Sequence, residues 1–160
     1  MARGNLSSRM KFRKQGVNRS DMECIPDDWG EGYPNVSVYC TVENQQMADY
    51  RLPIYLELPI RHKHICHEPM LGPINIEPYL ATGKIEYVLC GGESGEQARP
   101  CHYQWILDTR DQCIKYHVPF HFKQTGTFFV MNGKTYHIKR WLQQSQAAIN
   151  DIYRYGLDIE

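Results

Sequence analysis

Polar side chains come directly after several apolar stretches and are the residues best suited to chemistry. Glu43 follows the first of these stretches, Glu68 the second and Lys123 the fourth. The third stretch leads into the segment GGESG at residues 91–95, which contains Glu93. Carboxylates and an ammonium group can exchange protons or bind a polar ligand when a fold brings them together. We therefore take Glu68 and Glu93 as candidate acid/base residues and Lys123 as a candidate electrophile or phosphate partner.

The GGESG segment adds backbone N–H groups to this set. Glycines leave these donors free of side chains, as a phosphate or the edge of a nucleoside requires. The segment is neither GxGxxG nor a Walker loop, and the next expected helix begins too far downstream to direct its N-terminus at a ligand. A tight turn that needs glycine for its geometry explains the segment equally well. The candidate ligand-binding residues after these stretches are Glu43, Gly91, Gly92, Ser94, Gly95 and Gln124.

The spacing of apolar side chains predicts the elements that must position these residues. Alternating or continuous apolar residues predict strands at residues 35–42, 62–69, 85–95 and 118–126, and the third is stopped abruptly by Gly91 and Gly92. Helical spacing predicts helices at residues 43–58, 102–116 and 140–155. We expect the first helix to be interrupted or restarted at Pro53 and the last to end before Gly156. In the middle helix the residues expected to face inward are Ile106, Leu107, Cys113 and Ile114.

Strands that alternate with helices predict a parallel sheet built of βαβ units. Right-handed crossovers place the carboxyl ends of parallel strands at one rim, where ligands of open α/β sheets and barrels bind. We expect an α/β fold with a mostly parallel, partial barrel-like sheet, flanking helices and a C-terminal β-hairpin plus helix. The dipeptide at Asn132 and Gly133 suits the type I′ turn of that hairpin. A Glu just before or inside the first turn of a helix also complements the helix dipole, which by itself accounts for Glu43.

Composition excludes several classes of protein. The 160 residues include 18 Lys plus Arg and 18 Asp plus Glu, so no net charge attracts nucleic acid or acidic lipid. No apolar run approaches the roughly 18 residues of a membrane span, and the N-terminus lacks the apolar segment of a secretory signal. The six cysteines are widely spaced and form no CxxC pair. We expect reduced, mostly buried cysteines in a cytoplasmic protein with no membrane association.

Histidine spacing suggests a metal site as an alternative. His62, His64 and Cys66 alternate on one face of the second predicted strand, and His67 adjoins Glu68. A divalent cation needs three or four ligands, and the sequence marks no further partner. We therefore predict no metal site, neither an iron–sulfur cluster nor stoichiometric zinc.

A basic segment precedes the expected domain. We interpret residues 1–24 as a basic flexible arm and residues 25–160 as a single α/β domain. The arm is either simply solvated or contacts a phosphate backbone. In the second case the residues that would bind nucleic acid are Arg9, Lys11, Arg13 and Lys14.

Six motifs together resemble a known family. They read PDDWGEGYPNV, TVENQQMADYRLP, EPMLGPI, GGESGEQARP, DQC and FKQTG. In this order they are similar to the C-terminal half of a phage- and mobile-element-associated family with a radical S-adenosylmethionine-like domain. Members of that family are usually known only as phage proteins of unknown function. The resemblance covers about residues 25–149 and adds Arg99 to the candidate ligand-binding residues, because it implies that residues matching Glu43, Glu68, Glu93, Arg99, Lys123 and Gln124 recur in the family.

The chain departs from that family in one respect. The resembling proteins carry closely spaced, cluster-binding cysteines in an N-terminal half that this chain lacks. None of the six cysteines here can replace three thiolates within a short loop. We therefore expect no iron–sulfur cluster and no bound cofactor, although S-adenosylmethionine or a nucleotide could still bind.

Three functions remain open. We favour a phage or mobile-element binding protein that associates with a protein, such as a host-defence protein or a second copy, or with nucleic acid. The alternative is a nucleoside- or S-adenosylmethionine-binding enzyme that uses the rim, and a fragment of a longer protein is the third. About four strands cannot close an eight-stranded barrel, so residues 35–42 should form a free edge. A partner would cover this edge and its apolar face, unless residues 1–34 fold back over it; that face consists of Val36, Val38, Cys40 and Val42.

Overall fold

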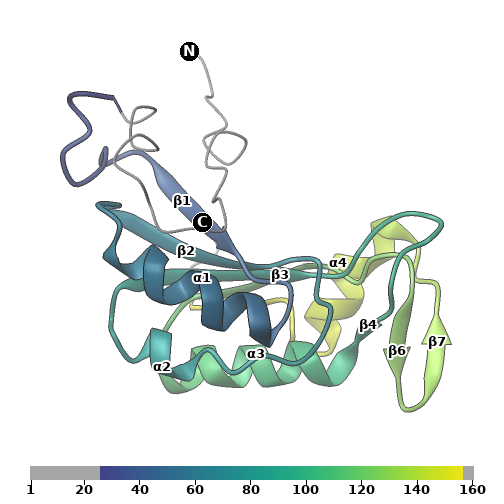
Figure 1. The fold of residues 1–160 in the computed structure, drawn as a ribbon. Helices are drawn as coiled ribbons and strands as arrows, with labels where there is room; N and C mark the ends of the chain where they lie inside the picture. The colour runs from purple at the N-terminus through teal and green to yellow at the C-terminus, as the bar shows by residue number, and fades with distance from the viewer. Residues whose placement is uncertain (1–25, 157–160) are drawn as a thin grey trace.

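Five strands form the main sheet of the computed structural model, which describes residues 26–156. Their order across the sheet is β1-β2-β3-β5-β8 (Figure 1). The first four are parallel to one another, and β8 pairs antiparallel with β5. Arg9, Lys11, Arg13 and Lys14 lie outside the described residues. The strand bounds are β1 (Ser37–Thr41), β2 (His62–His67), β3 (Ile85–Gly91), β5 (Phe120–Gln124) and β8 (Arg154–Tyr155).

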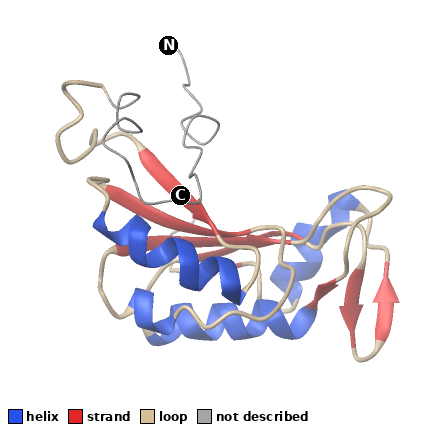
Figure 2. Cartoon of the chain, in the orientation of Figure 1, coloured by secondary structure: helices blue, strands red, loops and turns tan. Residues whose placement is uncertain are grey.

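Four helices accompany this sheet in the described part of the chain. They are α1 (Gln45–Glu57), α2 (Glu77–Leu80), α3 (Tyr103–Lys115) and α4 (Arg140–Ile149). Helices α1, α2 and α3 lie on the same face of the sheet (Figure 2). None of the helices within residues 26–156 is long and apolar enough to cross a membrane. The expected α/β fold with a mostly parallel sheet is confirmed, and the described strands form an open sheet rather than a closed barrel.

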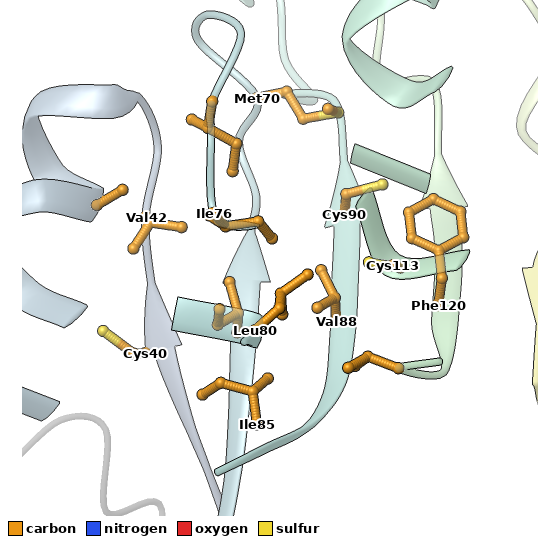
Figure 3. Packing of buried hydrophobic residues seen from close by; sticks show 14 of the residues in the cluster. Cys40, Val42, Met70, Ile76, Leu80, Ile85, Val88, Cys90, Cys113 and Phe120 are labelled. Carbon is orange, nitrogen blue, oxygen red and sulfur yellow. The ribbon is translucent and has the colours of Figure 1, made fainter. Parts of the chain in front are cut away.

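The core lies between the sheet and the helices (Figure 3). Alternate residues of each strand point into it, among them Val88 and Cys90 of β3 and Phe120 of β5. Cys40 and Val42 are also buried, and Val36 and Val38 are partly buried against the core. The chain itself therefore covers much of the apolar face that we expected a partner to cover. The reason is that α1 packs against β1, where Tyr55 Oη donates to the Val38 carbonyl (2.6 Å).

Helix α1 continues through Pro53, contrary to the expected interruption. Proline has no N–H for the carbonyl four residues earlier, which weakens the helix at that point. Leu52 before it and Tyr55 and Leu56 after it are buried, whereas Pro53 itself is exposed. Burial on both sides of the proline therefore holds the helix together. Its N-terminus is capped by Asn44, whose side chain accepts from the Met47 N–H (3.0 Å).

The last helix ends at Ile149 rather than near Tyr155. Asp151, with a φ of 52°, then turns the chain so that β8 can pair with β5. Gly156 therefore follows a strand and does not end a helix. The apolar spacing after Ile149 would allow the helix to continue. The chain instead leaves the helix, because residues 154–155 pair with β5 of the main sheet.

The inward side of α3 differs from the prediction at two positions. Ile106 and Cys113 are buried as expected. Ile114 is 38% exposed, and Leu107 is only partly buried against the core. Thr109 is buried in their place, where its hydroxyl donates to the carbonyl of Trp105 (2.8 Å).

A second, three-stranded sheet has the order β4-β6-β7. Its strands are β4 (Cys101–His102), β6 (Phe129–Met131) and β7 (Lys134–Tyr136). Strands β6 and β7 form the expected hairpin, and its turn residues Asn132 and Gly133 have φ angles of 51° and 71°. Positive φ at both positions is what a type I′ turn requires. Strands β4 and β8 and helix α2 were not expected, because elements of two to four residues carry no periodic pattern.

Candidate functional site

The loops after β1, β2, β3 and β5 meet at the carboxyl end of the sheet. We call residues 42–44, 68–72, 91–99 and 123–127 the rim. Backbone hydrogen bonds join its loops in sequence across the sheet. The Leu71 N–H donates to Glu43 O (2.8 Å), the Met70 N–H to Gly91 O (2.9 Å), and the Gly92 N–H to Gln124 O (2.8 Å). The rim is therefore a continuous hydrogen-bonded layer that holds its side chains in place.

Four of the predicted site residues form one cluster on this rim. Glu68 Oε2 accepts from Lys123 Nζ (3.0 Å), and Glu68 Oε1 accepts from Gln124 Nε2 (3.1 Å). Gln124 Nε2 also lies 3.3 Å from Ser94 Oγ. We call Glu68, Ser94, Lys123 and Gln124 the Glu68 cluster. The side chain of Glu68 is 16% exposed and that of Lys123 is 49% exposed, so a ligand could reach the cluster from solvent.

Two glycines make room for the cluster and for the loops beneath it. A Cβ on Gly91 would lie 3.0 Å from Glu68 Oε1 and 3.4 Å from Gln124 Cγ. A Cβ on Gly92 would lie 2.1 Å from the carbonyl oxygen of Thr125. Close packing against rigid backbone therefore requires glycine at position 92, which supports the geometric explanation of the GGESG segment there. At position 91 a Cβ would instead displace the flexible Glu68 side chain. Gly95 differs, since a Cβ there would meet nothing within 4 Å and its φ is 131°.

Glu93 has a different partner from Glu68. Its carboxylate accepts from Arg99 Nε (2.8 Å), from Arg99 Nη2 (2.7 Å) and from the Arg99 backbone N–H (2.8 Å). These hydrogen bonds lower the pKa of Glu93 to about 2. A carboxylate held so firmly in its ionised form is suited to closing residues 93–99 into a fixed loop. Within the described residues, Glu68 is thus the better placed of the two carboxylates for contact with a ligand.

Glu43 pairs with a residue that the sequence did not mark. Arg51 Nη1 on α1 lies 2.8 Å from Glu43 Oε2 and donates to the Thr41 carbonyl (2.6 Å). Because Asn44 caps α1, Glu43 lies just before the first turn of the helix, one of the two positions that we expected. Its role in the structure is therefore an ion pair that ties the end of β1 to α1.

Aromatic side chains cover the sheet face opposite to helices α1, α2 and α3. Tyr39 and His64 have ring centroids 4.8 Å apart, and His64 and Tyr87 have centroids 5.3 Å apart. Burial raises the pKa of Tyr87 to about 12, so its hydroxyl is a donor, and His121 Nδ1 lies 3.0 Å from it. We call Tyr39, His64, Tyr87 and His121 the ring face. Side chains two residues apart along a strand share a face. Glu68 follows His64 and Cys66 at this spacing, and Lys123 follows His121, so Glu68 and Lys123 lie on the same face as the rings.

His67 ends β2 but does not reach the rim surface. It is fully buried among the helices, and Thr109 Oγ1 lies 3.4 Å from its Nδ1. Burial lowers the pKa of His67 to about 4, so the ring is neutral near pH 7. Its position next to Glu68 in the chain therefore does not make it part of the Glu68 cluster.

The described residues do not fit a metal ion or an iron–sulfur cluster. Within residues 26–156, no three His, Cys, Asp or Glu side chains are grouped so as to hold a metal. A cluster needs thiolates, and burial raises the pKa of Cys66 to about 11 and that of Cys101 to about 12. His62 and His64 instead lie near Glu86, with His62 Nδ1 2.8 Å from its carboxylate.

An apolar cavity of about 440 Å³ lies between the hairpin and α4. Its lining includes Phe122, Phe129, Met131, Leu142 and Ile152. No predicted site residue lines it, and few polar groups face it. It therefore offers little to a polar ligand, and the rim remains the better candidate site.

The loops of the rim are recognisable in the sequence, but the partners of their side chains are not. We did not predict Arg51, whose distance of eight residues from Glu43 corresponds to no motif, or the ring face. Tyr39 and His64 alternate with buried residues along their strands, which indicates that both lie on the outer face of the sheet. That the aromatic rings from four strands form one surface can be recognised only from the order of the strands in the sheet.

Comparison with protein families gives one match. The model of the family described as "Protein of unknown function (DUF5131)" matches residues 6–151. No curated protein and no solved structure matches the chain. Since the family model covers most of the 160 residues, the chain belongs to the DUF5131 family.

Proposed function

We propose that this chain binds a nucleoside-type ligand at the rim, with S-adenosylmethionine as the first candidate. The observation that carries the proposal is the Glu68 cluster. Two side chains from the end of β5, Lys123 and Gln124, donate to the carboxylate of Glu68, which follows β2. Ser94, from the loop after β3, joins the cluster through Gln124. Their backbone is held by hydrogen bonds between the loops, so the polar groups are arranged before a ligand arrives.

The cluster and the ring face supply complementary chemistry. Glu68 would accept hydrogen bonds from an ammonium group or from ribose hydroxyls, and Lys123 would pair with a carboxylate or phosphate. Gln124 and Ser94 offer further donors and acceptors. A heteroaromatic base would lie on Tyr87, since bases stack on aromatic side chains. The proposed ligand therefore combines a planar base with a charged, hydroxylated tail.

The proposal includes the origin that the sequence motifs imply. We propose that the sheet corresponds to half of a radical S-adenosylmethionine-like barrel of phage or mobile-element origin. The described cysteines do not fit an iron–sulfur cluster, so the proposal contains no radical step. We propose binding alone, in which Glu68 and Lys123 contact the ligand.

Calorimetric titration of the full chain with S-adenosylmethionine, adenosine and AMP tests this proposal. We expect saturable binding of at least one of them, weakened by about tenfold or more in Glu68→Gln, because hydrogen bonds to a charged group contribute about 1.5–3 kcal/mol. Glu93→Ala should weaken binding through its loop.

Glu57→Gln is the matched control, because Glu57 is exposed on α1 and pairs with Lys84 at the opposite end of the sheet. This variant should bind as the wild type does. No saturable binding to any of the three compounds, or equal binding by Glu68→Gln and the wild type, would overturn the proposal.

A further inference from the structure

Strand β1 is the one long, unprotected edge among the described strands. At the other end of the main sheet β8 has two residues and includes Arg154. In the small sheet the edge strand β7 carries Lys134. Short length and charged residues are devices that keep edge strands from pairing with other chains. By contrast, β1 has five residues, SVYCT, with no charge and no proline.

The outward backbone groups of β1 can be identified from its pairing with β2. The Val42 N–H donates to Cys66 O (2.9 Å), so the residues in step with Val42 direct their backbone toward β2. Backbone direction alternates along a strand, and Ser37, Tyr39 and Thr41 therefore direct theirs to the free edge. Within residues 26–156 no strand pairs with this edge. Arg51 donates to the Thr41 carbonyl, so that acceptor is already used. The N–H and C=O groups of Ser37 and Tyr39 and the N–H of Thr41 remain available to a partner strand.

Exposed apolar side chains accompany this edge. Tyr39 is 42% exposed. Tyr50 and Ile54, one turn apart on α1, are also exposed, on the helix whose Arg51 and Tyr55 contact β1. Tyr39 belongs to the ring face, whereas Tyr50 and Ile54 lie on the helix that covers the opposite face of the sheet. Exposed apolar side chains on both sides of unpaired backbone groups favour a partner that supplies both a strand and apolar contacts.

We propose that β1 pairs antiparallel with β1 of a second copy of this chain, about a two-fold axis at Tyr39. In this register Tyr39 faces its own copy, and Ser37 faces Thr41. Because all five residues are neutral, no like charges meet across the axis. The outward groups of Tyr39 then form the reciprocal pair of hydrogen bonds that an antiparallel ladder places between opposite residues.

A second copy fits this edge better than nucleic acid does. Binding to nucleic acid depends on lysines and arginines that neutralise phosphates, and β1 contains neither. In an isologous dimer the same surface of both copies meets, so the surface must be complementary to itself. A neutral strand that pairs about one central residue meets this requirement. The interface contains no residue of the Glu68 cluster, although Tyr39 packs against Tyr87 of the ring face with ring centroids 6.1 Å apart. Dimerisation and ligand binding are measured separately, so either proposal can fail without the other.

Sedimentation velocity of the full chain, from low to several hundred micromolar, tests the proposal. The wild type should shift from monomer to dimer with increasing concentration. Tyr39→Lys and Tyr39→Glu should each stay monomeric, since like charges then lie opposite each other. A one-to-one mixture of these two variants should dimerise again, because the charges across the axis become complementary.

Tyr39→Phe is the matched neutral control, which keeps the exposed ring, and it should dimerise as the wild type does. Hydrogen exchange in the wild type gives a second measure that needs no variant, and the Tyr39 amide should exchange more slowly as concentration rises. A wild type that is monomeric throughout, a monomer that retains nucleic acid, or dimerisation of Tyr39→Lys equal to that of the wild type would each overturn the proposal.

Discussion

Lys123 of β5 reaches Glu68 beyond β2 across an intervening strand, with Nζ 3.0 Å from Oε2. The strand between them is β3, which ends at Gly91. Because Gly91 has no side chain, the carboxylate of Glu68 can lie over it and contact two residues of β5. This bridge over a glycine creates the polar cluster that we propose as the binding site.

The ion pair between Glu68 and Lys123 should contribute little to the stability of the ligand-free protein. A double-mutant cycle with Glu68→Gln and Lys123→Met should give a coupling of about 0.5–1 kcal/mol, because Lys123 is half exposed and solvent screens the pair. Urea unfolding of the four proteins measures this coupling. A value well above that range would mean that the pair is mainly a structural link, with no charge left over for a ligand.

Alanine substitutions at the two glycines should differ in their effects. Gly92→Ala should destabilise the fold by about 1–3 kcal/mol, since the new Cβ meets the rigid Thr125 carbonyl. Gly91→Ala should cost less than about 1 kcal/mol, because the Glu68 side chain can move away. Gly91→Ala should nevertheless weaken ligand binding. Urea unfolding and calorimetry of both variants check this, and equal destabilisation by the two substitutions would contradict it.

Loss of the Glu93 carboxylate should loosen one loop without unfolding the protein. In Glu93→Gln the Arg99 N–H and guanidinium lose a charged acceptor. We expect faster hydrogen exchange at Arg99, with unchanged exchange in β2 and β3. Glu96→Gln, an exposed substitution in the same loop, is the control. Unchanged exchange at Arg99 would show that the ion pair does not hold the loop.

Stability should fall on mild acidification because of His67. Its pKa in the folded chain is about 4, below the ordinary value of 6.5. Between these two pH values the unfolded chain binds a proton that the folded chain does not. The free energy of unfolding therefore decreases as pH falls from 6.5 to 4, by up to about 1.4 kcal/mol per pH unit for one proton.

Urea unfolding across this pH range measures the slope, and His67→Gln should have a smaller one. The slope should not vanish in that variant, because burial also lowers the pKa of His64 and His121. An identical slope in His67→Gln and the wild type would contradict this assignment.

Regular elements and the rim could be predicted from the sequence because their signals are local. Strand β3 shows its apolar residues and its glycine end directly, and the Asn132 and Gly133 turn has the dipeptide that its φ angles need. The convergence of Glu68 and Lys123 followed from the rule that parallel strands share a carboxyl edge. The partner of Glu43 could not be predicted in this way, because Glu43 pairs with Arg51 only when α1 packs against the sheet.

Tertiary packing also decides the places where local patterns misled. Pro53 would interrupt an isolated helix, yet buried side chains on both sides keep α1 continuous. Residues after Ile149 have helical spacing, yet β8 pairs with β5. Both outcomes depend on surfaces that exist only after the sheet has formed, which a local reading of the chain does not include.

The most direct test of the central claim is an amide-resolved NMR titration of the full chain with S-adenosylmethionine. We expect saturable shifts at the rim that are lost in Glu68→Gln, at Gly91, Gly92, Ser94 and Gln124. Saturable shifts confined to residues around the cavity at Leu142 and Ile152, or none at the rim with S-adenosylmethionine, adenosine and AMP, would contradict it.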